Sequence, residues 1–420
     1  MVRVTTGILL LALLACPLVS DSNASQSLDG TLEGYLSLAQ NSSPAIAAAS
    51  ARYDAARAKV NRAGGLPDPV VSYGHYFEEV ETRVGPQVYR LGVRQKLPWF
   101  GKLSLAEGAA SERAAAESER LRAARLDVAM SVTRAFAEYA YLGRAIEVTE
   151  ERLSLLGALE AVVRSSYSSG SDSYGDVMKA QIGLARAEDS LASLLARRRA
   201  SSSRLSAAVG VRDEGELPLP DMIPDAVHPQ GSLEAALFEE QSPELLSLRH
   251  ETEAARYEQR LARRAYFPDL TVGVDYIATD DALMPVEDSG KDPLIGVASI
   301  SFPLWFGKHA AGVRQADSAL DARERMTEQR TIELVAELRM LEFELDDAVR
   351  RVALYAERLV PAGEQSVAAT DAAYRAGTAD FDALVVAHEA ALEFELALAR
   401  SRADALTAAA ELVRLTGSDY

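Results

Sequence analysis

An internal duplication constrains the fold of this chain more than any other feature of its sequence. The segment TLEGYLSLAQNSSPAI, from Thr31, is echoed by SLEAALFEEQSPELL, and LPDPVVSYGHY, from Leu66, is echoed by FPDLTVGVDYI. The only two tryptophans, Trp99 and Trp305, each begin the tetrapeptide WFGK. Because the spacing between echoes stays near about 200 residues, the chain contains two copies of one structural unit.

The duplication predicts five parts along the 420 residues. Four prolines separate the two copies and exclude regular structure there, so that segment is predicted to be an extended linker. The predicted parts are a signal peptide (1–15), an N-terminal linker (16–27), a first repeat (28–210), a proline-rich linker (211–231) and a second repeat (232–420).

The N-terminus has the pattern of a secretory signal. One arginine precedes an apolar run from Gly7 to Val19, which is too short to span a bilayer. The single cysteine, Cys16, cannot form an internal disulfide. Its segment, Leu-Leu-Ala-Cys, resembles a bacterial lipobox, which predicts lipidation of Cys16. Ordinary cleavage near Ala24 is the alternative.

The composition favours long helices and excludes some partners. Aromatic residues make up only 6% of the chain and alanine is abundant, which suits closely packed helices. The formal net charge of −18 argues against nucleic acid, because neutralising phosphates requires clustered lysine and arginine. An acidic pore that tolerates cations fits this charge, and so does simple solubility.

Each repeat changes from a helical to an alternating pattern after a Pro-Asp pair. A helix is predicted from Leu28 to Ala63, followed by two strands in each copy. Apolar side chains fall on one face of these strands, and Ile295 and Val297 are assigned to that face in the last strand. The other residues assigned to it are Val71, Tyr73, His75, Tyr89, Leu91, Val93, Val272, Val274 and Tyr276.

Long helices follow the strands. A seam of apolar residues spaced by three and four predicts a helix from Lys102 to Tyr167, about 100 Å long. A second helix is predicted from Asp172 to Val209, about 57 Å long. The sequence therefore predicts a mainly α chain with a small β part and helical hairpins at the other end.

Four strands per chain cannot close a barrel. In a bilayer the open edges would leave backbone groups without partners, so several chains must combine. Three chains would supply 12 strands, enough for a barrel with a lumen, which the helices would continue as a coiled-coil tunnel.

The ordered motifs resemble a known family. LEGYLSLAQNSSP with its echo LEAALFEEQSP, LPDP, QKLPWFGK and YRAGTADFDAL make the chain similar to TolC-like outer-membrane factors (outer membrane efflux proteins), nearest the heavy-metal efflux branch. The resemblance implies a homotrimer in the outer membrane, in contact with its lipid and with most of the chain in the periplasm. It also implies a periplasmic adaptor protein and an inner-membrane pump as partners.

The resemblance also implies a functional tip at the helix-hairpin turns. Candidate residues for adaptor docking and tunnel closure are Gly170, Tyr174, Arg375, Gly377, Asp382 and Leu384. Ser168 takes the place of the arginine in the first copy. Candidates for an acidic ring at the tunnel mouth are Asp172, Asp176, Asp380 and Asp382. Helix N-capping is the alternative role for each aspartate.

The WFGK strings lie where a strand leaves the membrane. Trp99, Phe100, Trp305 and Phe306 are predicted to form a girdle at the membrane–water boundary, with the nearby lysines reaching headgroups. A packed strand-to-helix corner, turned at glycine, is the alternative.

No catalytic, cofactor or metal-binding motif is present in the sequence, and its five histidines have no ligand spacing. We therefore expect no enzyme activity and no cofactor. The predicted function is a passive exit duct of a tripartite efflux system, with metal cations as one candidate cargo. The alternatives are a type I protein secretion duct and a periplasmic coiled-coil lipoprotein that forms no channel.

Overall fold

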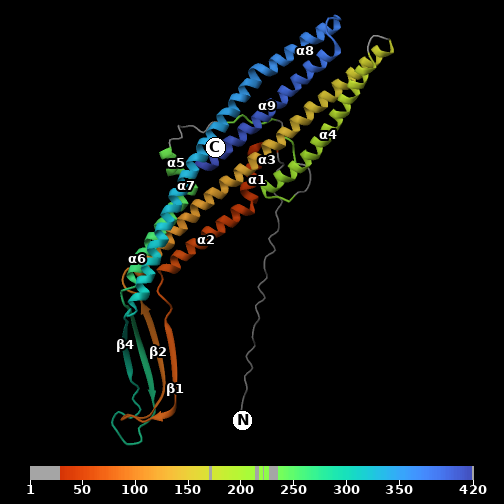
Figure 1. Cartoon of the computed structure of the whole chain (residues 1–420). Helices are drawn as coiled ribbons and strands as arrows, with labels where there is room; N and C mark the ends of the chain where they lie inside the picture. Colours follow the sequence, from red (N-terminus) through yellow and green to blue (C-terminus); the bar gives the residue numbers. More distant parts are fainter. Residues whose placement is uncertain (1–28, 170–172, 213–216, 221, 227–234, 419–420) are drawn as a thin grey trace, which may run out of the picture.

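The computed structural model describes residues 29–169, 173–212, 217–220, 222–226 and 235–418. Cys16, the predicted signal peptide and the predicted N-terminal linker lie outside these residues. The chain is a long rod, with a small sheet at one end and the turns of two helical hairpins at the other (Figure 1).

The same series of elements occurs twice, which confirms the internal duplication. The first series is α1 (Leu32–Ser42), α2 (Pro44–Gly64), β1 (Val70–Val80), β2 (Gln87–Leu97), α3 (Lys102–Ser168) and α4 (Tyr174–Val209). The second is α5 (Ala235–Gln241), α6 (Pro243–Arg264), β3 (Asp269–Thr279), β4 (Leu294–Ser301), α7 (Phe306–Leu354), a π-helical turn (Tyr355–Leu359), α8 (Val360–Arg375) and α9 (Phe381–Thr416).

The prediction of one continuous helix from Leu28 to Ala63 was wrong. Ser43 is extended, with φ −68° and ψ 117°, and it separates α1 from α2. The break follows from Pro44, which has no N–H to donate and disfavours a helical conformation at the residue before it. Ser242 and Pro243 separate α5 from α6 in the same way.

The four strands form one antiparallel sheet in the order β1-β2-β3-β4. Val71 lies opposite Val93, which lies opposite Val274, so these residues share one apolar face. Val274 in turn lies opposite Gly296. The apolar face of β4 therefore carries Leu294, Gly296, Ala298 and Ile300.

The prediction that Ile295 and Val297 lie on the apolar face was wrong, because they pair with residues of the polar face of β3. The second repeat has Leu304 between its proline and its tryptophan, whereas Pro98 and Trp99 are adjacent. Aligning the two copies on tryptophan shifts β4 by one residue, and a one-residue shift exchanges the two faces of a strand.

The helices continue the order of the strands (Figure 1). Next to the sheet, α2 packs on α3, α3 on α6, and α6 on α7. Farther away, α4 packs on α3, α3 on α9, and α9 on α7. At each level, the helices thus form a single layer of four that extends the sheet. We call this layer the helical wall. Among the helices in the described part of the chain, none combines the length and apolar character needed to cross a bilayer.

A second layer covers the middle of the rod. Tyr35 of α1 packs with Phe136 and Tyr139 of α3 in a buried cluster. The hydroxyls of Tyr35 and Tyr139 donate to the carbonyls of Pro218 and Leu217, at 2.8 and 2.7 Å. Burial is the main cause that raises the pKa of Tyr35 to about 12. The described residues of the proline-rich linker form neither helix nor strand, and Val211, Leu217 and Ile223 lie against this cluster.

Candidate functional site

The polar face of the sheet carries a cluster of ion pairs. Asp275 of β3 has a fully buried side chain and accepts hydrogen bonds from Arg90 and Arg94 of β2. Asp269, on the same face, binds Lys96 at 3.1 Å and Lys102 at 2.7 Å. The cluster therefore joins the two β-hairpins of the chain and ends at the first residue of α3.

One face of α3 continues this polar face toward the hairpin tips. Side chains spaced by three and four residues share a side of a helix. Lys102, Arg113, Arg120 and Glu138 are separated by 11, 7 and 18 residues, which are close to whole numbers of helical turns, and Glu138 lies about ten turns from Lys102. We call the polar face of the sheet and the side of the helical layer with these residues the inner face. The cavities of about 890 and 670 Å³ open on it.

The cavity nearer the sheet has a volume of about 670 Å³ and lies between α2, α3, α6 and α7. Alanines form its floor, and charged side chains surround it. Its cations are Lys59, Arg62, Arg113, Arg120 and Arg323. Its carboxylates are Glu117, Glu251 and Glu258. Positive charge is therefore in excess here, although the chain as a whole is acidic.

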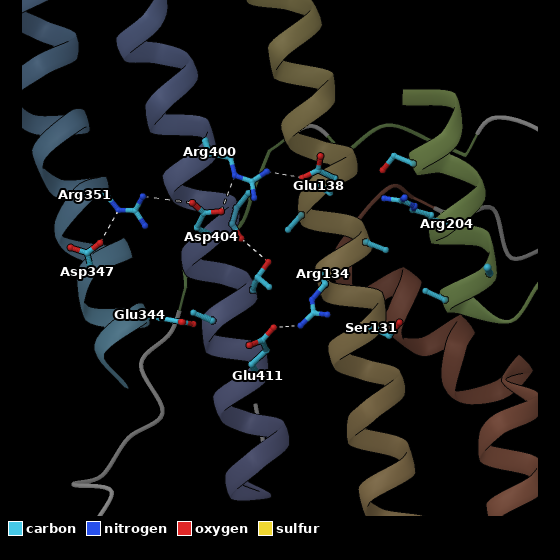
Figure 2. Close-up of a pocket in the computed structure, with 18 of the residues that line it drawn as sticks. Ser131, Arg134, Glu138, Arg204, Glu344, Asp347, Arg351, Arg400, Asp404 and Glu411 are labelled. Atoms are coloured by element: carbon cyan, nitrogen blue, oxygen red, sulfur yellow. Dashed lines mark hydrogen bonds and ion pairs between the residues drawn. The ribbon is translucent and has the colours of Figure 1, made fainter. Parts of the chain in front are cut away.

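The second cavity, of about 890 Å³, lies between α3, α4, α7 and α9 (Figure 2). Arg134 of α3 pairs with Glu411 of α9 across it. Arg400 bridges Glu138 at 2.7 Å and Asp404 at 2.8 Å. Its charges nearly balance, because four arginines (Arg134, Arg204, Arg351, Arg400) face five carboxylates (Glu138, Glu344, Asp347, Asp404, Glu411).

The apolar face of the sheet is open to the surroundings of a single chain. The side chains of Val71, Tyr73 and Phe77 are 71, 66 and 94% exposed. Water is an unfavourable neighbour for a continuous apolar surface of this kind. Alternation of an apolar outer face with a polar inner face is typical of strands that line a membrane barrel.

The first WFGK string forms a packed corner. Trp99 stacks on Phe267, with ring centres 5.9 Å apart, and its backbone N–H donates to Asp269. Gly101 turns the chain into α3 with φ +84°, a conformation that favours glycine. Lys102 is only 16% exposed and binds Asp269 and the carbonyl of Phe267. The expectation that it reaches lipid headgroups therefore fails here, and Phe100 is the exposed aromatic residue of the corner.

The second WFGK string is open. Trp305 and Phe306 are 78 and 64% exposed, and α7 already begins at Phe306. Gly307 lies inside the helix and has no positive φ. Lys308 is exposed and has no ion pair with any residue that the structure describes. The sequence WFGK thus forms a packed corner in the first repeat, whereas in the second repeat its tryptophan, phenylalanine and lysine are exposed.

The first hairpin turn is described only in part, because Gly170 and Asp172 lie outside the described residues. Tyr174 is 61% exposed and lies against Tyr167, with ring centres 5.8 Å apart. Ser173 is the N-cap of α4 and accepts a hydrogen bond from the backbone N–H of Asp176. The start of α4 therefore presents one exposed tyrosine next to a capped helix end.

The second turn is described completely. Gly377 has φ +74°, which allows the chain to reverse after α8. Arg375 is 77% exposed and forms an ion pair with Asp371 at 2.7 Å. Asp380 is the N-cap of α9 and accepts a hydrogen bond from the N–H of Ala383 at 2.9 Å. Capping is therefore one role of this aspartate.

Sequence reasoning missed a cation among the tip aspartates. Lys179 of α4 lies 2.8 Å from Asp382 of α9 and 3.3 Å from Asp176. Hydrogen bonds from Ser173 and Lys179 hold the pKa of Asp176 below its usual value. The carboxylates of Asp382 and Asp176 raise the pKa of Lys179. Two of the four predicted acidic residues are thus partly neutralised within the chain.

Leu384 is buried rather than presented at the tip surface. It is 3% exposed and packs with Val163 of α3 and Val177 of α4. Farther from the tip, Arg144 and Arg152 of α3 pair with Glu395 and Glu389 of α9. These contacts hold the two hairpins of one chain together along their length. Their partners are more than 200 positions apart, so no local sequence pattern predicts them.

Among the described residues, no group of three histidine, cysteine, aspartate or glutamate side chains is arranged to hold a metal ion.

The sequence profile of the outer membrane efflux protein family matches residues 35–211 and 236–418, so the chain belongs to this family. A search of curated proteins finds no match.

Solved structures show the same fold. The outer membrane protein VceC from Vibrio cholerae is 21% identical, with a TM-score of 0.72 and coverage of 92% of this chain and 96% of that one. A membrane protein from Pseudomonas aeruginosa is 18% identical, with a TM-score of 0.79 and coverage of 94 and 91%. The open-state MtrE outer membrane channel of Neisseria gonorrhoeae is 16% identical, with a TM-score of 0.77 and coverage of 92 and 89%.

Proposed function

We propose that the chain forms the outer-membrane exit duct of a tripartite efflux system, as a homotrimer with a 12-stranded barrel and a helical tunnel. One observation carries this proposal. The sheet has an apolar outer face and two open edges, β1 and β4. A bilayer tolerates such a sheet only if other strands satisfy both edges.

The internal repeat indicates which residues close those edges. Within the chain, Lys102 at the β2–α3 corner binds Asp269 at the start of β3. The equivalent residues in the other repeat are Lys308, after β4, and Asp68, before β1. They lie at opposite edges of one sheet, so only a second copy brings them together. We expect Lys308 to bind the partner's Asp68.

The aromatic contact at the corner also has an equivalent pair of residues at the two edges of the sheet. Trp99 stacks on Phe267 within the chain, and their equivalents are Trp305 and Leu66. Trp305 is 78% and Leu66 is 55% exposed in the single chain. Contact between Trp305 and the partner's Leu66 would cover both. It would also turn the open WFGK string into a closed corner and complete the girdle at the membrane boundary.

The register of the new strand pair follows from the β2–β3 pair. Applying the structural alignment of the repeats to that register places Ile300 opposite the partner's Val71. Ala298 then lies opposite the partner's Tyr73. Both pairs join residues of the apolar face, so the outer surface continues from one copy to the next.

The hairpin tips are the proposed contact with the periplasmic adaptor, which in turn connects the duct to an inner-membrane pump. Exposed Arg375 and Tyr174, with the turn glycines Gly170 and Gly377, are the proposed contact residues. The chain would then lie in the outer membrane, with its helices in the periplasm. Leu384 and Asp382 would act by holding the hairpins together.

The sequence leaves one candidate cargo and two alternative kinds of protein to consider. Metal cations are one candidate cargo, and a type I secretion duct would pass proteins through the same architecture. A periplasmic lipoprotein without a channel would leave the apolar face of the sheet in water, and it is the least compatible with the exposed sheet.

A cross-linking experiment tests assembly. Ile300→Cys combined with Val71→Cys should give disulfide-linked dimers and trimers on oxidation, because directly opposite strand residues meet the distance requirement. Ile300→Cys with Val80→Cys, at the other end of β1, is the matched control. Conductance in planar bilayers tests the channel.

Exchanging the charges gives an independent check. Lys308→Asp alone should reduce the heat-labile trimer, and adding Asp68→Lys should restore it. A chain that remains monomeric in lipid, without cross-linked species or conductance, would rule out the duct.

A further inference from the structure

We propose that the cavity nearer the sheet binds organic anions of drug size, and that such anions are a cargo of the duct. The second part rests on the proposed function. The first part concerns helices of a single chain and stands independently of assembly.

The charge of the cavity is opposite to that of the protein. Its lining has five cations and three carboxylates, whereas the whole chain has a formal net charge of −18. A concave surface with an excess of one sign concentrates ligands of the other sign. Anions are therefore the ligands that this surface attracts.

Ion pairs within the cavity engage three of its five cations and, among the residues that the structure describes, leave two without a carboxylate. Glu258 pairs with Arg113. Glu251 is shared, because both Arg120 and Arg323 donate to it. Arg120 also pairs with Glu117, at 2.6 Å. The three carboxylates of the lining are thus paired with Arg113, Arg120 and Arg323, and the excess positive charge is that of Lys59 and Arg62.

Two cations of α2 have no carboxylate partner in the described part of the chain. Lys59 and Arg62 lie three residues apart, which places them next to each other on the side of α2 that lines the cavity. Neither forms an ion pair with another described residue. A carboxylate, sulfonate or sulfate between them would gain two charge-assisted contacts without breaking an existing one.

The floor of the cavity suits an apolar body. Ala109 and Ala110 of α3 and Ala254 and Ala255 of α6 present methyl groups rather than long side chains. The volume of about 670 Å³ lies in the range of small-molecule sites. A ligand with a flat or apolar body and one anionic group matches both the floor and the cationic side.

The inner face offers such an anion a continuous path toward the sheet. Beyond Lys102 it carries Arg90, Arg94 and Lys96, which pair with the two carboxylates of Asp269 and Asp275. Rings of arginine and lysine favour anions in pores. Metal cations would meet the same residues as a barrier.

Fluorescence anisotropy of two xanthene dyes tests the site on the purified full chain in a nonionic detergent. Fluorescein is anionic and rhodamine 6G is cationic, and their ring systems are alike. We expect fluorescein to bind more tightly than rhodamine 6G. Its affinity should fall by about tenfold when Lys59→Gln and Arg62→Gln are combined, because two charge-assisted contacts are lost.

Two further variants separate charge from folding defects. Arg57→Gln removes one cation from the opposite side of α2, where Arg57 lies against Tyr53, and should leave fluorescein binding unchanged. Glu251→Gln removes the shared carboxylate of Arg120 and Arg323, and should strengthen fluorescein binding severalfold.

Equal affinity for both dyes would overturn the proposal. So would equal losses in Arg57→Gln and in the Lys59→Gln, Arg62→Gln pair. The trimer is measured in the same samples by heat-labile migration on gels. Loss of assembly with intact dye binding contradicts the duct alone, and assembly without dye binding contradicts the anion site alone.

Discussion

The Nζ atom of Lys179 lies 2.8 Å from Oδ2 of Asp382, and this contact joins the tips of two hairpins that are 203 residues apart in the chain. The same ammonium reaches Asp176 at 3.3 Å. One lysine therefore holds two carboxylates of different hairpins at the end of the rod where a tunnel would open.

Replacing Lys179 should loosen the tip. In Lys179→Gln the two aspartates lose their shared cation and repel each other. We expect conductance in planar bilayers to rise modestly, on the order of twofold to fivefold, because exposed ion pairs are weak. Lys179→Arg keeps the charge and is the control. Unchanged conductance in Lys179→Gln would show that this contact does not restrain the tip.

The ion pairs of Lys179 with Asp176 and Asp382 should not respond to pH near neutrality. The pKa of Asp176 is lowered from 3.8. The stability that its carboxylate gives to the contact between the hairpins is therefore complete above pH 3.8 and is lost as the pH falls through the lower pKa of the folded state. The pKa of Lys179 is raised from 10.5. The stability that its ammonium gives to this contact is therefore complete below pH 10.5 and is lost as the pH rises through the higher pKa of the folded state.

Conductance of the unmodified protein should therefore stay constant from about pH 5 to about pH 9. A single-channel titration over that range measures it. A transition near pH 6 or 7 that persists in Lys179→Gln would show that another group controls the opening.

Two glycines of the polar face should differ sharply in their tolerance of a methyl group. A Cβ on Gly92 would overlap Oδ1 of Asp275 and lie 2.6 Å from Oγ of Ser72, whereas a Cβ on Gly74 would meet nothing within 4 Å. Gly92→Ala should displace Asp275 from its arginines and reduce the yield of folded protein in membranes. Gly74→Ala should match the unmodified chain. Equal yields would mean that the Asp275 cluster does not stabilise the sheet.

The linker should depend on two tyrosine hydroxyls. Tyr35→Phe and Tyr139→Phe each remove a partly buried hydrogen bond to the carbonyl of Pro218 or Leu217, at a cost of about 0.5–1.5 kcal/mol. Urea unfolding should shift accordingly, and limited proteolysis should cut the linker faster. Tyr53→Phe on α2, away from the linker, should change neither. Rates equal to that control would contradict a role for these bonds.

The duplication, the order of strands and helices, and the apolar faces of three strands were predictable, because each depends on local periodicity repeated twice. The break before Pro44 was visible in the sequence, since Pro243 occupies the same place in the second repeat. The apolar face of β4 was assigned wrongly, because aligning the two copies on tryptophan does not account for the additional residue Leu304. Lys179, the shared Glu251 and the open corner at Trp305 depend on contacts between distant segments, which no local pattern encodes.

The two repeats have diverged at their corners and their tips, and this divergence sets a stoichiometry. Three chains would present six hairpins in a ring, but only three would carry the exposed Arg375, because Ser168 holds that place in the other three. A periplasmic protein that recognises the arginine would saturate at three copies per ring, and one that recognises only the shared helical wall would saturate at six.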